Sequence, residues 1–334
     1  MKSWRAQFRY DPIPPLLASG EEALQYFVRR DLLGERTDPI DRIWELPEAR
    51  KILKKQRPDG SFAFPAGKSK QGAADYPLIE TWKQFRYLVE VYGMTKEQPQ
   101  AKHAAEFIFS RQTGEGDFRG FLANQYATYY TGALLSLLNQ AGYAEDPRVD
   151  RGIRWLLGMR QDDGGWTIPL LTHPFSGKAI YRLTSRKAEP VEPDRSKPFS
   201  HNWTGMALRA FAAHPRYRKT KEAQAAAGLL ADRFFQPDVY SSYQEAEYWV
   251  RFQYPFWWNN LVAALDSITR IGLGADDERI GRALQWLIDH QEKDGLWRDT
   301  YAKPRGRGKE TPKIREARRW ISLAVCRVFR RVYD

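Results

Sequence analysis

The amino-acid sequence predicts an all-α fold in which paired inner and outer helices close into an α/α toroid of the α6/α6 barrel type. Two observations predict it. A short turn pattern recurs along the chain, each time after a helical stretch with apolar residues at helical spacing. Longer and more apolar helical stretches lie between these turns, so two kinds of helix alternate. An open solenoid is the alternative, since helical hairpins also stack without closing. Closure is favoured because the inner stretches are aromatic on several faces.

The recurrent turn begins with Gln and runs through Gly or Asp to an aromatic residue. An apolar residue stands four positions before each Gln, and glycine then ends the helix. A fixed period of this kind is the signature of a repeat architecture. The clear copies are 56–62, 112–118, 161–166 and 291–297, with Gln236-Pro237-Asp238 as a decayed fifth.

The stretches between the turns supply the inner helices. Together with a helix near 20–33, they give six segments that interleave with five outer ones, so we interpret residues 1–334 as a single domain. The other five are expected at 75–93, 124–142, 200–214, 253–272 and 312–333.

Residues 167–200 interrupt this alternation. The segment holds five prolines, which exclude a continuous helix. We interpret it as an irregular insertion that acts as a lid, and a disordered loop is the alternative.

Composition limits the chemistry. Cys326 is the sole cysteine, so disulfides and thiolate metal clusters are excluded, and the five histidines show no ligand spacing. We therefore expect no metal and no cofactor. The N-terminus lacks a secretory signal, and no apolar run is long enough to span a membrane, so we expect a cytoplasmic protein without a transmembrane segment.

The formal net charge of +12 is concentrated near the C-terminus. Residues 303–331 hold 11 Lys and Arg against Glu310 and Glu316. Such a patch favours an anionic partner, nucleic acid included. The alternative is the solvated flank of a helix.

The turns Arg160-Gln161-Asp162-Asp163-Gly164-Gly165-Trp166 and Gln291 to Trp297 resemble the Gln-Trp repeats of squalene-hopene and oxidosqualene cyclases. The spacing also suits the β subunits of protein prenyltransferases. The resemblance covers nearly the whole chain and implies the toroid fold of these families, in which the Gln ties neighbouring outer helices together. It also implies an isoprenoid or lipid-like ligand, a hydrophobic small molecule, in a central aromatic cavity.

The catalytic motifs of these families do not carry over. Asp276-Asp277 follows Gly274-Ala275 and so lacks the earlier Asp of an Asp-x-Asp-Asp acid motif, and no Asp-Asp-x-x-Asp magnesium cluster is present. The zinc site of prenyltransferases needs an Asp two residues before its Cys, where this chain has Ala324. Whether the chain is an enzyme therefore stays open. As an enzyme, we expect terpenoid chemistry with a replaced acid.

In an alternating toroid the N-termini of the inner helices gather at one mouth, where their N–H groups favour anions. The catalytic candidates at these starts are Asp75, His201 and Glu80, with Asp75 the first choice for the replaced acid and His201 the second. A helix cap and a satisfied helix-start histidine are the respective alternatives for these two.

Aromatic and amide side chains at the same helix starts are expected to form a polar-rimmed funnel that binds the ligand. Core packing between helices is the alternative for each of them. These candidates are Tyr76, Trp82, Tyr126, Tyr130, Trp203, Phe256, Trp257, Trp258 and Asn259.

Two other classes of function stay open at this stage. One is a non-catalytic binding or scaffold protein whose basic C-terminus meets an anionic partner. The other is a carbohydrate-active α/α-barrel enzyme, for which Glu245 and Glu247 are the paired carboxylates to consider.

Overall fold

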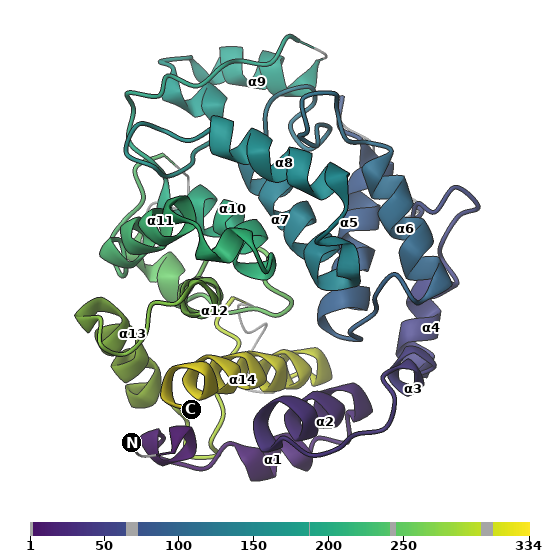
Figure 1. Ribbon diagram of the computed structural model, residues 1–334, viewed down its shortest axis with the longest axis vertical. Helices are drawn as coiled ribbons and strands as arrows, with labels where there is room; N and C mark the ends of the chain where they lie inside the picture. The colour runs from purple at the N-terminus through teal and green to yellow at the C-terminus, as the bar shows by residue number, and fades with distance from the viewer. Residues whose placement is uncertain (1–2, 65–72, 187, 241–244, 302–309) are drawn as a thin grey trace. The chain divides into compact units, whose positions relative to one another are not determined.

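The structure, a computed structural model, describes residues 3–64, 73–186, 188–240, 245–301 and 310–334. Within these ranges the chain is helical and forms no β-strand (Figure 1). The predicted all-α class is confirmed. The helices are α1 (Ile13–Leu17), α2 (Glu22–Val28), α3 (Asp41–Trp44), α4 (Pro47–Leu53), α5 (Tyr76–Glu90), α6 (Pro99–Phe109), α7 (Thr128–Leu138), α8 (Pro147–Gly158), α9 (Gly177–Ser185), α10 (His201–Ala213), α11 (Lys221–Asp232), α12 (Leu261–Ile271), α13 (Glu278–Asp289) and α14 (Pro312–Tyr333).

The chain divides into two compact units, each described by itself below. One holds residues 41–226, and the other holds residues 1–40 together with 227–334. The boundary on the C-terminal side falls within α11. The single domain stays a prediction.

The predicted alternation of two kinds of helix is confirmed in the described part of the chain. The helices α4, α6, α8, α11 and α13 each lead into a Gln turn, and we call them the Gln-turn helices. The helices that alternate with them along the chain, from α2 before the first to α14 after the last, are called the intervening helices: α2, α5, α7, α10, α12 and α14.

Each clear Gln turn uses its Gln side chain as a cross-link. Gln112 is typical, because its Nε2 group donates to the carbonyl of Gly116 in its own turn at 2.8 Å and to that of Arg148 at the start of α8 at 2.9 Å. Gln56 makes the same pair of bonds, to Gly60 in its turn and to Gln100 in α6. At these first two turns, the Gln side chain therefore joins one Gln-turn helix to the next.

Glycine is required where the turn approaches the next helix. Gly60 has φ +86°, and a Cβ there would lie 2.3 Å from the backbone oxygen of His103. Gly116 has φ +115°, and its Cβ would lie 2.8 Å from the oxygen of Arg151. A side chain at either position would be strained in conformation and would also displace the neighbouring helix.

The aromatic residue of each turn is bonded to the following intervening helix. Its backbone N–H donates to a buried hydroxyl on that helix, so the turn is fixed on its second side as well. The four pairs are Phe62 with Thr81, Phe118 with Thr131, Trp166 with Thr204, and Trp297 with Ser322, at 3.0, 3.1, 2.8 and 3.0 Å.

A further link between Gln-turn helices is made by an Arg two residues after a capping Asp. Arg148 holds both carboxylate oxygens of Glu106 on α6, at 2.7 and 3.0 Å. Arg279 holds Asp232 of α11 at 2.7 Å, and its hydrogen bonds to Asp277 lower the pKa of that cap to about 2. The Asp276-Asp277 pair thus stands at the start of a Gln-turn helix, with Asp277 as its cap.

Two predicted segments differ from the structure. The stretch 253–260 is not helical, because Pro255 lacks an N–H and the side chain of Asn260 caps α12, accepting the N–H of Ala263 at 3.0 Å. Phe256, Trp257, Trp258 and Asn259 were expected at or just inside a helix start, and they lie before it instead.

The second difference is in the insertion. Residues 167–200 were expected to be irregular, yet they contain the nine-residue helix α9. Pro174 and Pro190 stand outside it, and Ser176 caps its first turn by accepting the N–H of Ala179 at 3.2 Å.

Candidate functional site

Aromatic side chains of three intervening helices and one loop meet within the unit of residues 41–226. The rings of Phe121 and Tyr130 are stacked, with centroids 3.8 Å apart, and Trp82 meets both edge-on at 5.9 and 5.0 Å. Tyr129 lies 4.3 Å from Tyr130 and 4.5 Å from Trp203. We call these five residues the ring cluster.

The ring cluster has a buried part and a half-buried part. Trp82, Tyr129 and Trp203 are 1%, 4% and 5% exposed, so they form its base. Phe121 and Tyr130 are only half-buried. The stacked pair is therefore the more accessible part of the ring cluster.

The close packing of α7 on α10 positions this cluster. A Cβ at Gly132 would lie 2.5 Å from the Cα of Ala207, so glycine lets the two helices approach. Further along, the side-chain amide of the buried Asn139 donates to the carbonyl of Ala210 at 3.0 Å. These contacts bring the first turn of α7 against the first turn of α10.

Arg86 adds a cation to the base of the ring cluster. Its guanidinium carbon lies 5.1 Å from the centroid of the Trp82 ring, and the side chain is 6% exposed. A cation over an indole ring is attracted to the ring face, more strongly where water is excluded. Sequence reasoning missed Arg86, although its spacing of four residues from Trp82 places both on one helix face.

Asp75, the first predicted acid, caps α5. Its Oδ1 accepts the N–H of Leu78 at 3.1 Å, and its Oδ2 lies 3.7 Å from Nε of Arg111. This geometry matches the cap alternative. The neighbouring Tyr76 packs on Phe64, with ring centroids 4.6 Å apart, outside the ring cluster.

The other two predicted acids are buried near helix starts. Glu80 is 6% exposed and accepts a hydrogen bond from Gln84 at 2.7 Å, while His201 is the first residue of α10 and 3% exposed. Each stands two residues before a cluster tryptophan, Trp82 or Trp203. Two residues correspond to about 200° around a helix, so the acids and the rings are on different helix faces.

Tyr126 is not part of the ring cluster. Its ring lies 5.7 Å from that of Trp155 on α8, and its hydroxyl is 2.9 Å from Glu115 and 3.0 Å from Glu192. Burial and these two carboxylates raise the pKa of Tyr126. A phenol has one proton, so it donates to one of the two carboxylates at a time.

The remaining predicted ligand-binding residues lie in the unit of residues 1–40 and 227–334. The rings of Trp257 and Trp258 are 6.0 Å apart, and Phe256 meets Tyr254 edge-on at 5.2 Å. Asn259 is 4% exposed. The predicted funnel residues are thus divided between the two units.

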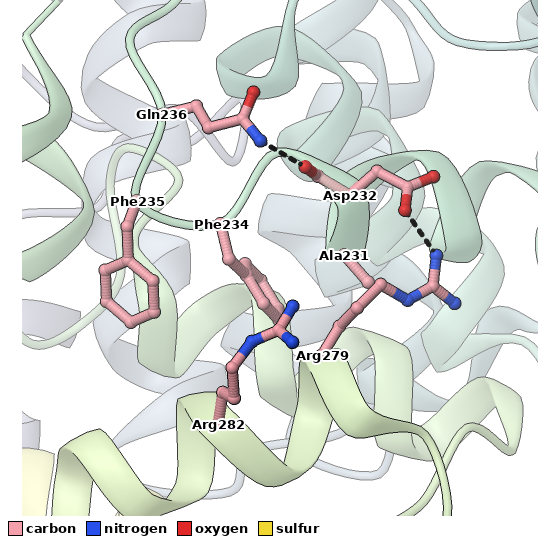
Figure 2. A pocket seen from close by; sticks show the side chains of 7 residues that line it. All are labelled: Ala231, Asp232, Phe234, Phe235, Gln236, Arg279 and Arg282. Atoms are coloured by element: carbon pink, nitrogen blue, oxygen red, sulfur yellow. Dashed lines mark hydrogen bonds and ion pairs between the residues drawn. The ribbon is translucent and has the colours of Figure 1, made fainter.

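A pocket of about 120 Å³ lies between α11 and α13, where the decayed fifth turn stands (Figure 2). Here Gln236 donates to the carbonyl of Asp232 at 2.8 Å, within its own helix end. The volume is below the roughly 300 Å³ at which ligand pockets begin, so the pocket is too small for an isoprenoid chain. Its lining residues are Ala231, Asp232, Phe234, Phe235, Gln236, Arg279 and Arg282.

The insertion is held at its base by the buried side chain of Gln125. Its Nε2 donates to the carbonyl of Glu189 at 3.0 Å, and its Oε1 accepts the N–H of Val191 at 3.0 Å. Gln161 also bonds the insertion, at the carbonyls of Asp194 and Lys197. The role of 167–200 as a lid stays a prediction.

The basic C-terminal helix α14 forms ion pairs with acidic side chains of its own unit. Four arginines of α14 form ion pairs, which supports the solvated flank over an anionic partner at this helix. Residues 303–309 of the predicted patch lie outside the described residues. The pairs are Arg318 with Asp294, Arg319 with Glu21, Arg327 with Asp31, and Arg331 with Asp266.

The structure also bears on the predicted carboxylate pair, on metal binding and on membrane-spanning helices. Glu245 and Glu247 are both exposed, at the 3-10 turn Ala246–Val250, and do not form an enclosed acid pair. In the described ranges, no three His, Cys, Asp or Glu side chains come together as a metal-binding group. Among the helices that the structure describes, none has both the length and the apolar character needed to cross a membrane.

The sequence is similar to that of squalene-hopene cyclases. Residues 70–172 match the family model of the squalene-hopene cyclase C-terminal domain. A squalene-hopene cyclase of Bradyrhizobium diazoefficiens is 25% identical over 262 residues, which cover 66% of this chain and 34% of that enzyme. The chain is thus similar to squalene-hopene cyclases in sequence, and it spans about a third of the length of this curated relative.

Two solved structures were also matched, both at low sequence identity. A protein from Actinoplanes is 16% identical at a TM-score of 0.45, with 88% of each chain covered. A type II terpene cyclase from Scytonema, in complex with geranylgeranyl dihydroxybenzoate, is 11% identical at a TM-score of 0.45, with 99% of this chain and 87% of that chain covered.

Proposed function

We propose that this protein binds an isoprenoid or other lipid-like molecule through the ring cluster. The stacked, half-buried pair of Phe121 and Tyr130 carries the proposal, because it offers apolar ring surface backed by buried aromatic residues. Four of the five cluster residues fall within residues 70–172, the part that matches the squalene-hopene cyclase model.

The ring cluster also suits terpenoid chemistry, since reactions of isoprenoids pass through cations. An aromatic ring face stabilises a cation by about 0.5 to 2 kcal/mol. A proton donor is needed to start such a reaction, and Glu80 and His201 are the buried candidates. Asp75 is the weaker candidate, because its carboxylate oxygens are already engaged in capping α5 and in a contact with Arg111.

The binding proposal is tested with geranylgeraniol and the purified full chain. Native mass spectrometry should detect a one-to-one complex, and Phe121→Ala and Tyr130→Ala should each weaken it about tenfold, the loss expected for a ring contact of roughly 1.4 kcal/mol. Tyr301→Ala, at an exposed ring in the other unit, is the matched control and should leave binding unchanged. Absence of a complex, together with no lipid in an organic extract of the native protein, would overturn the proposal.

The catalytic part is tested separately by chromatography of the products. Glu80→Gln and His201→Asn preserve approximate shape while removing a titratable proton. If either residue supplies the proton, its variant retains binding of the isoprenoid and loses turnover. Turnover that survives both substitutions would exclude these acids.

A non-catalytic scaffold is the second candidate, and one observation favours it. The buried rings Trp82, Tyr129 and Trp203 already contact other rings of the ring cluster, so side chains of the protein occupy its base. A scaffold would yield no bound isoprenoid in the extraction experiment, and substitution of Phe121 would then alter stability alone.

A further inference from the structure

The pocket between α11 and α13, beside the fifth turn, has the features of a small binding site (Figure 2). Its lining residues belong to the unit of residues 1–40 and 227–334, whereas the ring cluster belongs to the other unit. The volume of about 120 Å³ is somewhat below the roughly 150 Å³ in which a protein cavity holds benzene. The pocket therefore suits a compact group of about four or five carbon atoms.

Phe235 lines this pocket in a backbone conformation that is unusual for a bulky residue. Its φ is +61°, in the left-handed region, where a side chain crowds the following carbonyl oxygen. Glycine is the usual residue at such a place after a helix, and each of the four clear Gln turns has a glycine at positive φ. Residues strained in this way gather at ligand sites. The strain therefore points to a role for the Phe235 ring.

The rings around Phe235 give the pocket an apolar wall. Phe234 is 8% exposed, and its ring centroid lies 6.3 Å from that of the half-buried Phe235. On α13, the ring of Trp286 lies 6.0 Å from Phe235 and is stacked on His290, with centroids 3.7 Å apart. One buried ring and one ring that is partly open to solvent thus face the pocket.

The charged groups of the lining are two guanidiniums and one carboxylate, those of Arg279, Arg282 and Asp232. Arg279 is engaged within the protein, because it holds Asp232 and Asp277 and donates to the carbonyl of Gly228. Figure 2 shows its guanidinium turned to Asp232. The carboxylate of Asp232 is thereby paired, and Arg282 is the remaining cation of the lining.

Arg282 has donors to offer to an external group. In the described part of the chain its one ion pair is with Glu278, at 3.9 Å, which is too long for a hydrogen bond. The side chains of this pair are 71% and 92% exposed, so water screens their attraction. A carboxylate that arrives from solution can therefore form charge-assisted hydrogen bonds with the guanidinium.

We propose that this pocket binds a short branched-chain carboxylate. The carboxylate pairs with Arg282 at the mouth, and the branched alkyl group lies against the rings of Phe234 and Phe235. The excess of guanidinium over carboxylate groups favours an anion over a cation. The volume favours a short chain over a fused ring or a longer chain.

The first test compares three probes by ligand-observed NMR titration of the full chain. Isovalerate should bind with a dissociation constant of about 1 mM or tighter. Acetate has the charge without the branched chain, and 3-methylbutan-1-ol has the chain without the charge, so each should bind at least fivefold more weakly. Isovalerate that binds no better than acetate, or not at all at about 10 mM, would overturn the proposal.

The second test removes the cation at the mouth. Arg282→Gln should weaken isovalerate binding at least fivefold and leave the binding of the alcohol unchanged. Arg154→Gln on α8 is the matched control, since Arg154 is 68% exposed and is paired with Asp150 four residues before it, as Arg282 is with Glu278. The control should stay within about twofold of wild type. An unchanged Arg282→Gln variant, or an equal loss in both variants, contradicts the proposal.

The third test separates the ring of Phe235 from its backbone. Phe235→Gly should weaken isovalerate binding at least fivefold, while its thermal midpoint should be no lower than that of Phe235→Ala, because glycine accepts φ +61° without strain. In the wild-type protein, saturating isovalerate should slow amide hydrogen exchange at the end of α11 and not in α6. Wild-type affinity in the glycine variant, or equal slowing in both helices, would refute binding in this pocket.

Discussion

The side chain of Gln291 is hydrogen-bonded on both sides to the backbone of Tyr10. Its Nε2 donates to the carbonyl at 2.7 Å, and its Oε1 accepts the N–H at 3.0 Å. The same Nε2 also reaches the carbonyl of Gly295 in its own turn. The last Gln turn therefore ties the segment before α1 to the end of α13, in place of a further Gln-turn helix.

We expect Gln291→Ala to destabilise the protein by about 1 to 3 kcal/mol, because it leaves part-buried backbone groups of Tyr10 and the carbonyl of Gly295 without this partner. Chemical denaturation followed by circular dichroism measures this loss. Gln285→Ala removes an exposed glutamine that bonds Asp289 on the same helix, and it should cost less than about 0.5 kcal/mol. Equal losses would contradict the role of the cross-link.

Thr204→Val should lower the free energy of unfolding by about 1 to 3 kcal/mol. The hydroxyl of Thr204 accepts the N–H of Trp166 at 2.8 Å, and valine keeps the shape without an acceptor. Thr204→Ser retains the hydroxyl and should recover part of the loss. A valine variant as stable as wild type would show that this bond does not hold the turn.

Gly60→Ala should destabilise the protein by about 1 to 3 kcal/mol or more, because alanine is strained at φ +86° and its Cβ would overlap the oxygen of His103. Gly114 is the matched control in the next turn, since a Cβ there meets nothing within 4 Å. Gly114→Ala should leave the thermal midpoint nearly unchanged. A similar loss in both variants would contradict the close approach as its cause.

Acid stability should depend on Asp277. Hydrogen bonds from Arg279 lower its pKa in the folded protein to about 2, below the ordinary value of 3.8. The stabilisation is therefore present above about pH 4 and is lost as the pH falls toward 2. Asp277→Asn removes this component, which we expect to be about 1 kcal/mol at a partly exposed site. The difference between wild type and variant should shrink across that window, and a constant difference would contradict it.

The repeat could be predicted from sequence because its signals are local. A Gln, a Gly at φ > 0 and an aromatic residue stand within seven positions, and each has a role inside one turn. The hydroxyl partners Thr81, Thr131 and Thr204 lie up to 38 residues from the turns that they hold, and nothing in the local pattern marks them.

Part of the candidate site was also predicted, because its residues stand near local signals of a helix start. Trp82, Tyr130 and Trp203 were found because they stand near helix starts that the repeat defines. Tyr126 stands near such a start too, but Glu115 and Glu192 from other segments hold its hydroxyl.

The helix start before α12 was predicted wrongly. The apolar residues before Leu261 suggested a helix, although Pro255 and the cap at Asn260 delay the start of α12 to Leu261.

The fifth turn has a consequence for how the molecule opens. Because the amide of Gln236 stays within its own helix end, the side chain of Arg279 takes over the connection between α11 and α13, at Asp232 and at the carbonyl of Gly228. A contact that depends on the Arg279 guanidinium should open more readily than one cross-linked by a Gln side chain. Backbone amides at the end of α11 should therefore exchange hydrogen sooner, and proteases should cleave first near residues 233–240.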